Sequence, residues 1–167
     1  SVVFTEDDRL LATSQNGKIY VWNQAGELIK TLSGHTQGIE NVAVGKRAIA
    51  SASWDNTIRL WTLNGDEIKT PQALRHKGAV YTVSFRSDGQ SFASAGEHGD
   101  IKLWTVEGEL IKQWKAHDTQ INSLSFSGDL LASASGDGTV KLWKDGTLIR
   151  TLNSRNGQVY SVSFSPD

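Results

Sequence analysis

The sequence predicts an all-β protein, a β-propeller built of four-stranded antiparallel blades. Its 167 residues repeat three features with a period of about 40 residues. Tryptophans that end an alternating run recur at intervals of 39, 43 and 39 residues, at Trp22, Trp61, Trp104 and Trp143. Each is preceded by a run related to Ser-Val-Ser-Phe and followed by one related to Gly-Glu-Leu-Ile-Lys. Four-stranded units at this period are typical of propellers, and no segment shows the 3.6-residue period of an amphipathic helix.

Each repeat divides into four expected strands, which the second repeat illustrates. Residues 41–44 (NVAV) form the first strand, and the small apolar run 49–53 (IASAS) forms the second. Residues 57–61 (TIRLW) alternate in polarity, which is the period of a half-buried strand. The fourth strand is expected in the run that begins at residue 67 (EIKTP).

The residues at the expected turns are typical of tight hairpins. Between the second and third strands the repeats carry Asn-Gly, Asp-Asn, His-Gly and Asp-Gly, at 16–17, 55–56, 98–99 and 137–138. Such pairs tolerate the positive φ angles that two-residue hairpin turns require. Between the third and fourth strands every repeat has a glycine, which is a further turn signal.

Composition excludes several classes of protein. The 17 Lys and Arg balance 18 Asp and Glu, which argues against a nucleic-acid partner. The absence of cysteine excludes disulfides and cysteine-based zinc sites. The sequence contains no apolar stretch of membrane-spanning length and no signal peptide, so we expect a cytoplasmic protein without a membrane partner.

Three repeats carry a further constellation at fixed spacing. A His precedes the first strand, a Ser lies ten residues before the Trp, and a polar turn residue lies six before it. These sets are His35, Ser51, Asp55 and Trp61; His76, Ser94, His98 and Trp104; and His117, Ser133, Asp137 and Trp143. The pattern resembles the hydrogen-bonded structural tetrad of the WD-repeat (WD40-type) β-propeller family. The third repeat departs from it, because His98 replaces the turn Asp, and none of the four tryptophans is followed by the family's namesake Asp.

The repeats divide the chain into blades at approximately 1–34, 35–75, 76–116 and 117–154, with 155–167 opening a further blade. The resemblance implies rings of about seven or eight blades, so four repeats make about half a ring. Residues 161–167 echo residues 1–7. Two interpretations remain open: the chain is an excerpt of a longer array, or two copies join head to tail as a homo-oligomeric, eight-bladed ring.

The same residues could form a Ser-His-Asp hydrolase triad, since hydroxyl, imidazole and carboxylate are its ingredients. Three observations oppose this alternative. The set recurs, no G-x-S-x-G elbow exposes a nucleophile, and a chain ending on an indole N–H satisfies every buried partner. We therefore expect that the protein is not an enzyme. Without a phosphate loop or metal-ligand spacing, we also expect no cofactor and no metal.

Partner-binding positions are carried over from the resemblance. In the family, the residue before the turn Asp and residues near the start of the first strand contact partners. In this sequence the candidates are Trp54, Glu97, Glu40, Tyr81, Gln120, Asn122 and Tyr160. Trp54 is not required by the repeat pattern, and exposed aromatics are favoured anchors in interfaces. The alternative is a Trp54 side chain folded down on its own blade.

The sequence thus predicts a non-enzymatic protein–protein interaction scaffold that uses one loop face of the propeller. The alternative is a sensor or regulatory repeat array of a larger multidomain signalling NTPase or protease. The phrase GELIKTLSGH is similar to bacterial, cyanobacterial-like arrays of that kind. A fold alone does not establish function, so the identity of the protein partners stays open.

Overall fold

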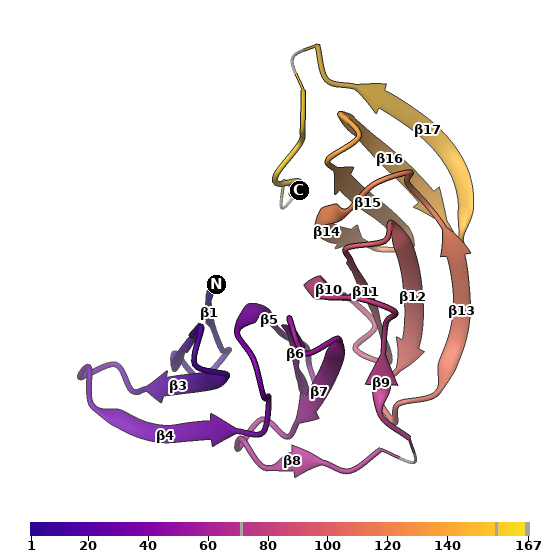
Figure 1. Cartoon of the computed structure of the whole chain (residues 1–167). Coiled ribbons are helices and arrows are strands. Elements are labelled where there is room, and N and C mark those ends of the chain that lie inside the picture. Colours follow the sequence, from indigo (N-terminus) through magenta and orange to yellow (C-terminus); the bar gives the residue numbers. More distant parts are fainter. Residues whose placement is uncertain (71, 156, 166–167) are drawn as a thin grey trace.

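The computed structural model describes residues 1–70, 72–155 and 157–165. These residues form antiparallel strands and turns, with no helix among them, and so none that could cross a membrane. Figure 1 shows the sheets side by side along an open arc, with the first strand of each sheet inside and the last on the outer rim. The all-β propeller prediction is confirmed, and the ring is not closed.

The strands of the first two sheets follow one another in chain order. The first sheet contains β1 (Val2–Phe4), β2 (Leu10–Thr13), β3 (Lys18–Trp22) and β4 (Leu28–Ser33). The second contains β5 (Ile39–Val44), β6 (Ile49–Ser53), β7 (Thr57–Trp61), β8 (Glu67–Ile68) and β9 (Leu74–Arg75).

The other two sheets have the same order. The third contains β10 (Val80–Phe85), β11 (Ser91–Gly96), β12 (Asp100–Thr105) and β13 (Leu110–Lys115). The fourth contains β14 (Ile121–Ser127), β15 (Leu130–Ser135), β16 (Thr139–Lys144) and β17 (Thr147–Asn153).

The turns between the second and third strands adopt the expected left-handed geometry. The second residue of each turn has a positive φ, at 76° for Gly17, 69° for Asn56, 72° for Gly99 and 83° for Gly138. Three are glycines, which pay no steric penalty there, and Asn tolerates the region better than most residues. Every blade therefore closes this hairpin in the same way.

The outer strand of the second sheet is split. Both β8 and β9 pair with β7, and Leu74 faces Ile58 as Leu32 faces Ile19 in the first sheet. The expected run ended at residue 71, a proline outside the described residues, and proline has no N–H for a sheet ladder. The detour lengthens the Trp-to-His connection from 13 residues in the first and third repeats to 15 here, which accounts for part of the 43-residue interval.

The core lies between neighbouring sheets. Leu11 and Ile19 of the first sheet pack against Ile49 and Trp61 of the second, and all four are nearly inaccessible to solvent. The same contact recurs at the next two interfaces, where the buried tryptophans are Trp104 and Trp143. Burial of a large apolar side chain stabilises a fold by about 1.5–3 kcal/mol, so each blade depends on its neighbour.

Trp22 differs from its three counterparts. It is only half-buried, and its ring lies 5.8 Å from that of Tyr20, tilted by 37°. Together with Phe4 and Leu10 it lines an open hollow of about 620 Å³. In the described part of the chain no sheet covers this face of the first blade, whereas a preceding blade covers Trp61.

A repeated hydrogen bond joins the inner strands of successive blades. The backbone N–H of Val83 donates to Asn41 Oδ1 at 3.0 Å, and that of Leu124 donates to Thr82 Oγ1 at 3.1 Å. The N–H of Val162 donates to Ser123 Oγ at 3.3 Å, in the same way. The segment 157–165 therefore lies beside β14 as β14 lies beside β10, on the inner side of the arc in Figure 1.

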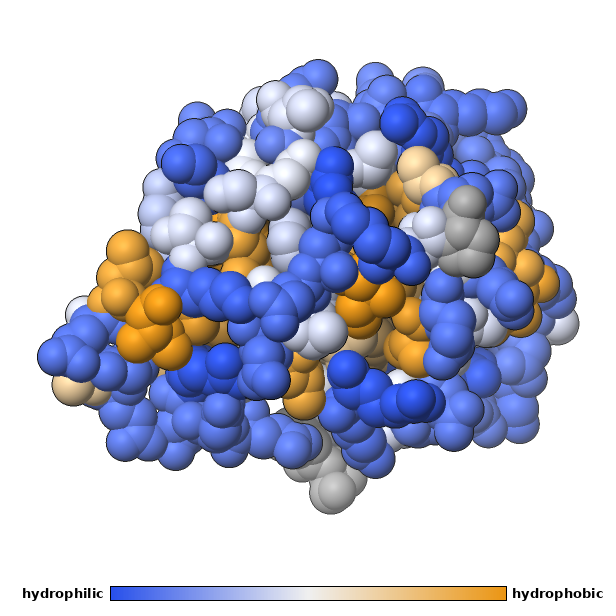
Figure 2. All heavy atoms as spheres, turned by 90° about the horizontal axis from the view of Figure 1, so that it is seen from below, coloured by the Kyte–Doolittle hydropathy of each residue, from blue (hydrophilic) through white to orange (hydrophobic). Residues whose placement is uncertain are grey.

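The surface seen in Figure 2 is mostly hydrophilic, with separate hydrophobic patches. Exposed apolar side chains on the outer strands include Leu28 and Ile29 of β4 and Leu148 and Ile149 of β17. In each strand the two apolar residues are adjacent, and a charged residue follows them, Lys30 in β4 and Arg150 in β17. Charged side chains on an edge strand oppose pairing with another chain.

Candidate functional site

The second and fourth blades each contain a continuous side-chain network. His35 Nδ1 lies 2.8 Å from Asp55 Oδ2, and His35 Nε2 lies 2.8 Å from Ser51 Oγ. The Trp61 indole N–H donates to the same serine oxygen at 3.0 Å. In the fourth blade the corresponding distances are 2.8, 2.7 and 2.9 Å, among His117, Asp137, Ser133 and Trp143.

The surroundings of the histidine and the aspartate in each network determine which of the two is charged. Burial lowers the pKa of His35 and of His117, and outweighs the aspartate beside each ring. Burial alone would raise the pKa of Asp55, but hydrogen bonds from Thr57, the Thr36 amide and His35 lower it to about 2. A neutral imidazole then donates from Nδ1 to the carboxylate and accepts the serine O–H at Nε2. Every polar group in the network has a partner.

The third blade has a shorter network. His76 Nε2 lies 2.7 Å from Ser94 Oγ, which also accepts the Trp104 indole N–H at 2.8 Å. Among the described residues no hydrogen bond joins His76 to the side chain of His98, which occupies the turn position of the aspartates. Burial, together with the nearby Lys102, lowers the pKa of His76 to about 3.

The geometry of these serines opposes a hydrolytic role. Ser51, Ser94 and Ser133 are wholly buried, so no substrate can reach their hydroxyls. A nucleophile needs access as well as a base within hydrogen-bond reach. In these three blades the networks instead connect the loop before the first strand to the third strand.

Sequence reasoning missed one residue of each complete network. Thr57 Oγ1 donates to Asp55 Oδ1 at 2.5 Å, and Thr139 Oγ1 donates to Asp137 Oδ1 at 2.7 Å. The third blade has Asp100 at this position. The available signal was a Thr two residues after the turn Asp in both complete sets.

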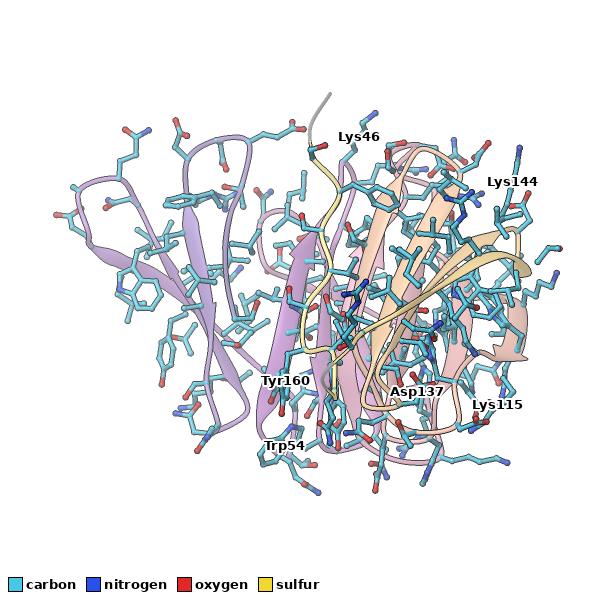
Figure 3. The ribbon with its side chains drawn as sticks, turned by 90° about the horizontal axis from the view of Figure 1, so that it is seen from above. Lys46, Trp54, Lys115, Asp137, Lys144 and Tyr160 are labelled. Carbon is cyan, nitrogen blue, oxygen red and sulfur yellow. The ribbon has the colours of Figure 1, made fainter. Side chains whose placement is uncertain are left out.

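Five of the seven candidate partner-binding residues come together at a second place. Glu40, Trp54, Tyr81, Asn122 and Tyr160 line one hollow of about 420 Å³. Figure 3 shows Trp54 and Tyr160 on the same side of the molecule, away from Lys46 and Lys144. The described segments of three blades and of the C-terminal stretch meet there.

A bulge directs the inner side chains into this hollow. Pairing between β5 and β6 passes from Ile39 directly to Asn41, which leaves Glu40 without a partner residue. The same irregularity skips Tyr81 in β10 and Asn122 in β14. A bulge bends its strand and re-aims the extra side chain, so one local defect repeated in three blades gathers these side chains at one place.

Trp54 is anchored at the edge of the hollow. Its backbone N–H donates to Gly38 O at 2.9 Å, and its indole N–H donates to Glu40 Oε2 at 3.1 Å. Trp54 is 44% exposed and its indole bonds a residue of its own blade, so the ring is held at the surface of that blade and not in its core. The bonds to Gly38 and Glu40 hold the ring beside the hollow.

Glu97 and Gln120 do not line the hollow. The Glu97 carboxylate accepts the Ala79 N–H at 3.0 Å, close to Gly78. The Gln120 side chain covers Gly136, where a Cβ atom would lie 2.5 Å from its amide nitrogen. Both side chains bridge the first and second strands of their own blades.

The described residues contain no metal-binding cluster, and those that line the hollow include no catalytic pair of carboxylates. No group of three or more His, Asp or Glu side chains there could hold a metal ion. No buried carboxylate pair of the kind used for acid–base chemistry lines the hollow at Trp54.

Four-stranded blades along an arc, three of them tied through a buried Ser to a Trp on the third strand, define a WD-type β-propeller. The chain belongs to the WD40 family: the sequence model described as "WD domain, G-beta repeat" matches residues 26–62, 68–105 and 108–144. Each match begins at or just before the outer strand of one blade and ends at or just after the third strand of the next. The sequence repeat is thus offset by one strand from the structural blade.

Known WD-repeat relatives are similar to the chain along most of its length. Protein DOA1 of Saccharomyces cerevisiae is 31% identical over 83% of the chain. Apoptotic protease-activating factor 1 of Rattus norvegicus is 26% identical over 99%, and transcriptional corepressor LEUNIG_HOMOLOG of Arabidopsis thaliana is 29% identical over 99%. The chain spans only 20%, 14% and 22% of the length of these relatives, respectively.

Proposed function

We infer that this chain is a non-enzymatic interaction scaffold that binds a protein partner at the hollow lined by Trp54, Tyr81 and Tyr160. One observation carries the proposal: five of the seven candidate partner-binding residues surround a single hollow. WD40 repeats in general imply a protein-interaction scaffold, and this hollow is the specific surface that we assign.

The chemistry of the hollow supports this role. Interface anchors are typically aromatic side chains that combine a large apolar body with a polar group. Trp54 and the two tyrosines are of this kind, and Tyr160 is 73% exposed. The buried networks below keep the blades rigid, which lowers the entropic cost of binding.

The experiment is comparative affinity enrichment with matched variants. Trp54→Ala combined with Tyr81→Ala should release the partners that the unchanged chain retains. Lys46→Ala combined with Lys144→Ala is the control, because both lysines point away from the hollow (Figure 3). Loss of the same partners from both variants, or from neither, would refute the assignment of this surface.

The alternative function is a regulatory array within a longer protein. It draws support from the relative named apoptotic protease-activating factor 1, of which this chain matches 14%. Full-length transcripts of the gene test it. A phosphate-loop NTPase or a Cys-His protease segment in the same reading frame would favour this alternative, and a reading frame made only of WD repeats would exclude it.

A further inference from the structure

We propose that the hollow at Trp54 binds an arginine side chain from a basic segment of the partner. The inference rests on the proposed function and specifies the chemistry of that same site. Its basis is the combination of three aromatic side chains, one carboxylate and one amide around a single hollow of about 420 Å³.

The aromatic side chains supply the attraction for a cation. Trp54, Tyr81 and Tyr160 come from the second blade, the third blade and the C-terminal segment, and all three line the hollow. The faces of aromatic rings carry negative potential and attract ammonium and guanidinium groups, most strongly when water is displaced. Because Glu40 accepts the Trp54 indole N–H, the largest of these rings is held in place before a ligand arrives.

The charge around the hollow has one sign. Glu40 lines it directly, and none of the described lining residues is basic. Burial raises the pKa of Tyr81, and the negative charges of Glu97 and Glu40 add to the effect, so both carboxylates act at this ring. An acidic or phosphorylated segment would be repelled from such a surface, whereas a cation is favoured.

Hydrogen-bond acceptors favour guanidinium over a methylated ammonium. The Asn122 amide N–H donates to Val159 O at 2.8 Å, and the Oδ1 atom of the same amide is an acceptor. Glu40 and the tyrosine hydroxyls add further acceptor oxygens. A planar guanidinium presents five donors and can stack on a ring while it binds a carboxylate. A trimethylammonium has no donor and would leave these oxygens unpaired.

The size of the hollow fits a side chain together with part of its backbone. Pockets for drug-sized ligands span about 300–1,000 Å³. At about 420 Å³ this hollow lies in the lower part of that range. It therefore suits one residue projecting from an extended peptide better than a bulky folded element.

The experiment measures binding of four otherwise identical peptides by calorimetry or fluorescence anisotropy. Their central residue is arginine, lysine, trimethyllysine or citrulline, the last being a neutral analogue of arginine. We expect arginine to bind most tightly and citrulline to lose about tenfold or more in affinity. Equal binding of arginine and citrulline would overturn the proposal, and so would a preference for trimethyllysine.

Two variants link the effect to the site. Glu40→Gln should reduce the preference for arginine over citrulline, and Trp54→Ala should weaken the arginine peptide by about tenfold, while Trp54→Phe restores part of the loss. Lys144→Ala on the other side is the control and should bind as the unchanged chain does. Unaltered binding by Glu40→Gln and Trp54→Ala would overturn the site assignment.

The outcome separates this inference from the proposed function. If partner enrichment depends on Trp54 and Tyr81 but the peptides do not discriminate charge, the scaffold surface stands and the arginine chemistry is wrong. If neither depends on these residues, both proposals fail.

Discussion

His117 and Ser133 are joined at 2.7 Å inside the fourth blade, and both side chains are almost wholly buried. The serine oxygen also accepts the Trp143 indole N–H, so the pair connects a loop to the third strand of the blade. Removing the imidazole therefore breaks two hydrogen bonds at once in a largely buried site.

We expect His117→Ala to lower the free energy of unfolding by about 1–3 kcal/mol, because it removes the imidazole that bonds Asp137 Oδ2 and the Ser133 hydroxyl in a buried site. Urea denaturation of the variant and of the unchanged chain measures this difference in the free energy of unfolding. His76→Ala should cost less, since the third blade has no carboxylate to strand. Equal losses in the two variants, or no loss in His117→Ala, would contradict a structural role for the network.

Stability should depend on pH in a defined direction. The folded pKa of His76 is about 3, below its usual 6.5, so the unfolded chain binds the proton more readily. Its contribution is present at neutral pH and is lost as pH falls from about 6.5 towards 3. Asp55 and Asp137, with folded pKa values of about 2 against 3.8, add a further loss below about pH 4.

Urea denaturation at a series of pH values tests this dependence. We expect the free energy of unfolding to decline from about pH 6.5 downwards. His76→Gln should reduce the slope of the decline between about pH 6.5 and 3. Some slope should remain, because burial also lowers the pKa values of His35 and His117. A profile of His76→Gln that is parallel to that of the unchanged chain would disprove the assignment.

The third blade can be completed by design. His98→Asp combined with Asp100→Thr reproduces the turn of the fourth blade, where Gly138 has φ 83° against 72° for Gly99. A carboxylate within reach of His76 should raise the free energy of unfolding by about 1 kcal/mol. The gain should vanish when His76→Ala is added. A gain that persists without His76 would show that it arises elsewhere.

The exposed face of the first blade should drive self-association of the 167-residue chain. Val2 and Phe4 are 65% and 67% exposed beside Trp22, on the face that is buried in later blades. We expect light scattering to give twice the mass of one chain, and Phe4→Lys to lower it. Ile149→Lys on β17, at a position of similar exposure, is the control. A monomer at all concentrations would rule out the two-copy ring.

Much of the fold could be predicted because its signals are local. Turn pairs such as Asp137-Gly138 and alternating runs such as 57–61 depend only on neighbouring residues. The half-buried state of Trp22 depends on which blade covers it, and its own repeat carries no such signal. The split of the outer strand into β8 and β9 also has no local signal. The residue that pairs with Ile58 is Leu74, which lies beyond the predicted run 67–71.

The candidate site was predictable in composition but not in arrangement. Family positions selected Glu40, Tyr81 and Asn122, and the bulges that turn them inwards are a property of strand pairing. Glu97 occupies the same repeat position as Trp54 yet binds the Ala79 amide of its own blade. A short acidic side chain can reach that N–H, whereas an indole cannot accept from it.

The bond from the Val162 amide to Ser123 repeats, with other residues, the bonds from Leu124 to Thr82 and from Val83 to Asn41. The acceptor changes among Asn, Thr and Ser while the donor stays on the backbone. The acceptor side chain at each junction between blades can therefore change in sequence while the hydrogen bond that orients one blade on the next is kept. The donor is a backbone N–H, which only a substitution to proline removes. Tandem duplication of a repeat would lengthen such an array and leave its curvature unchanged.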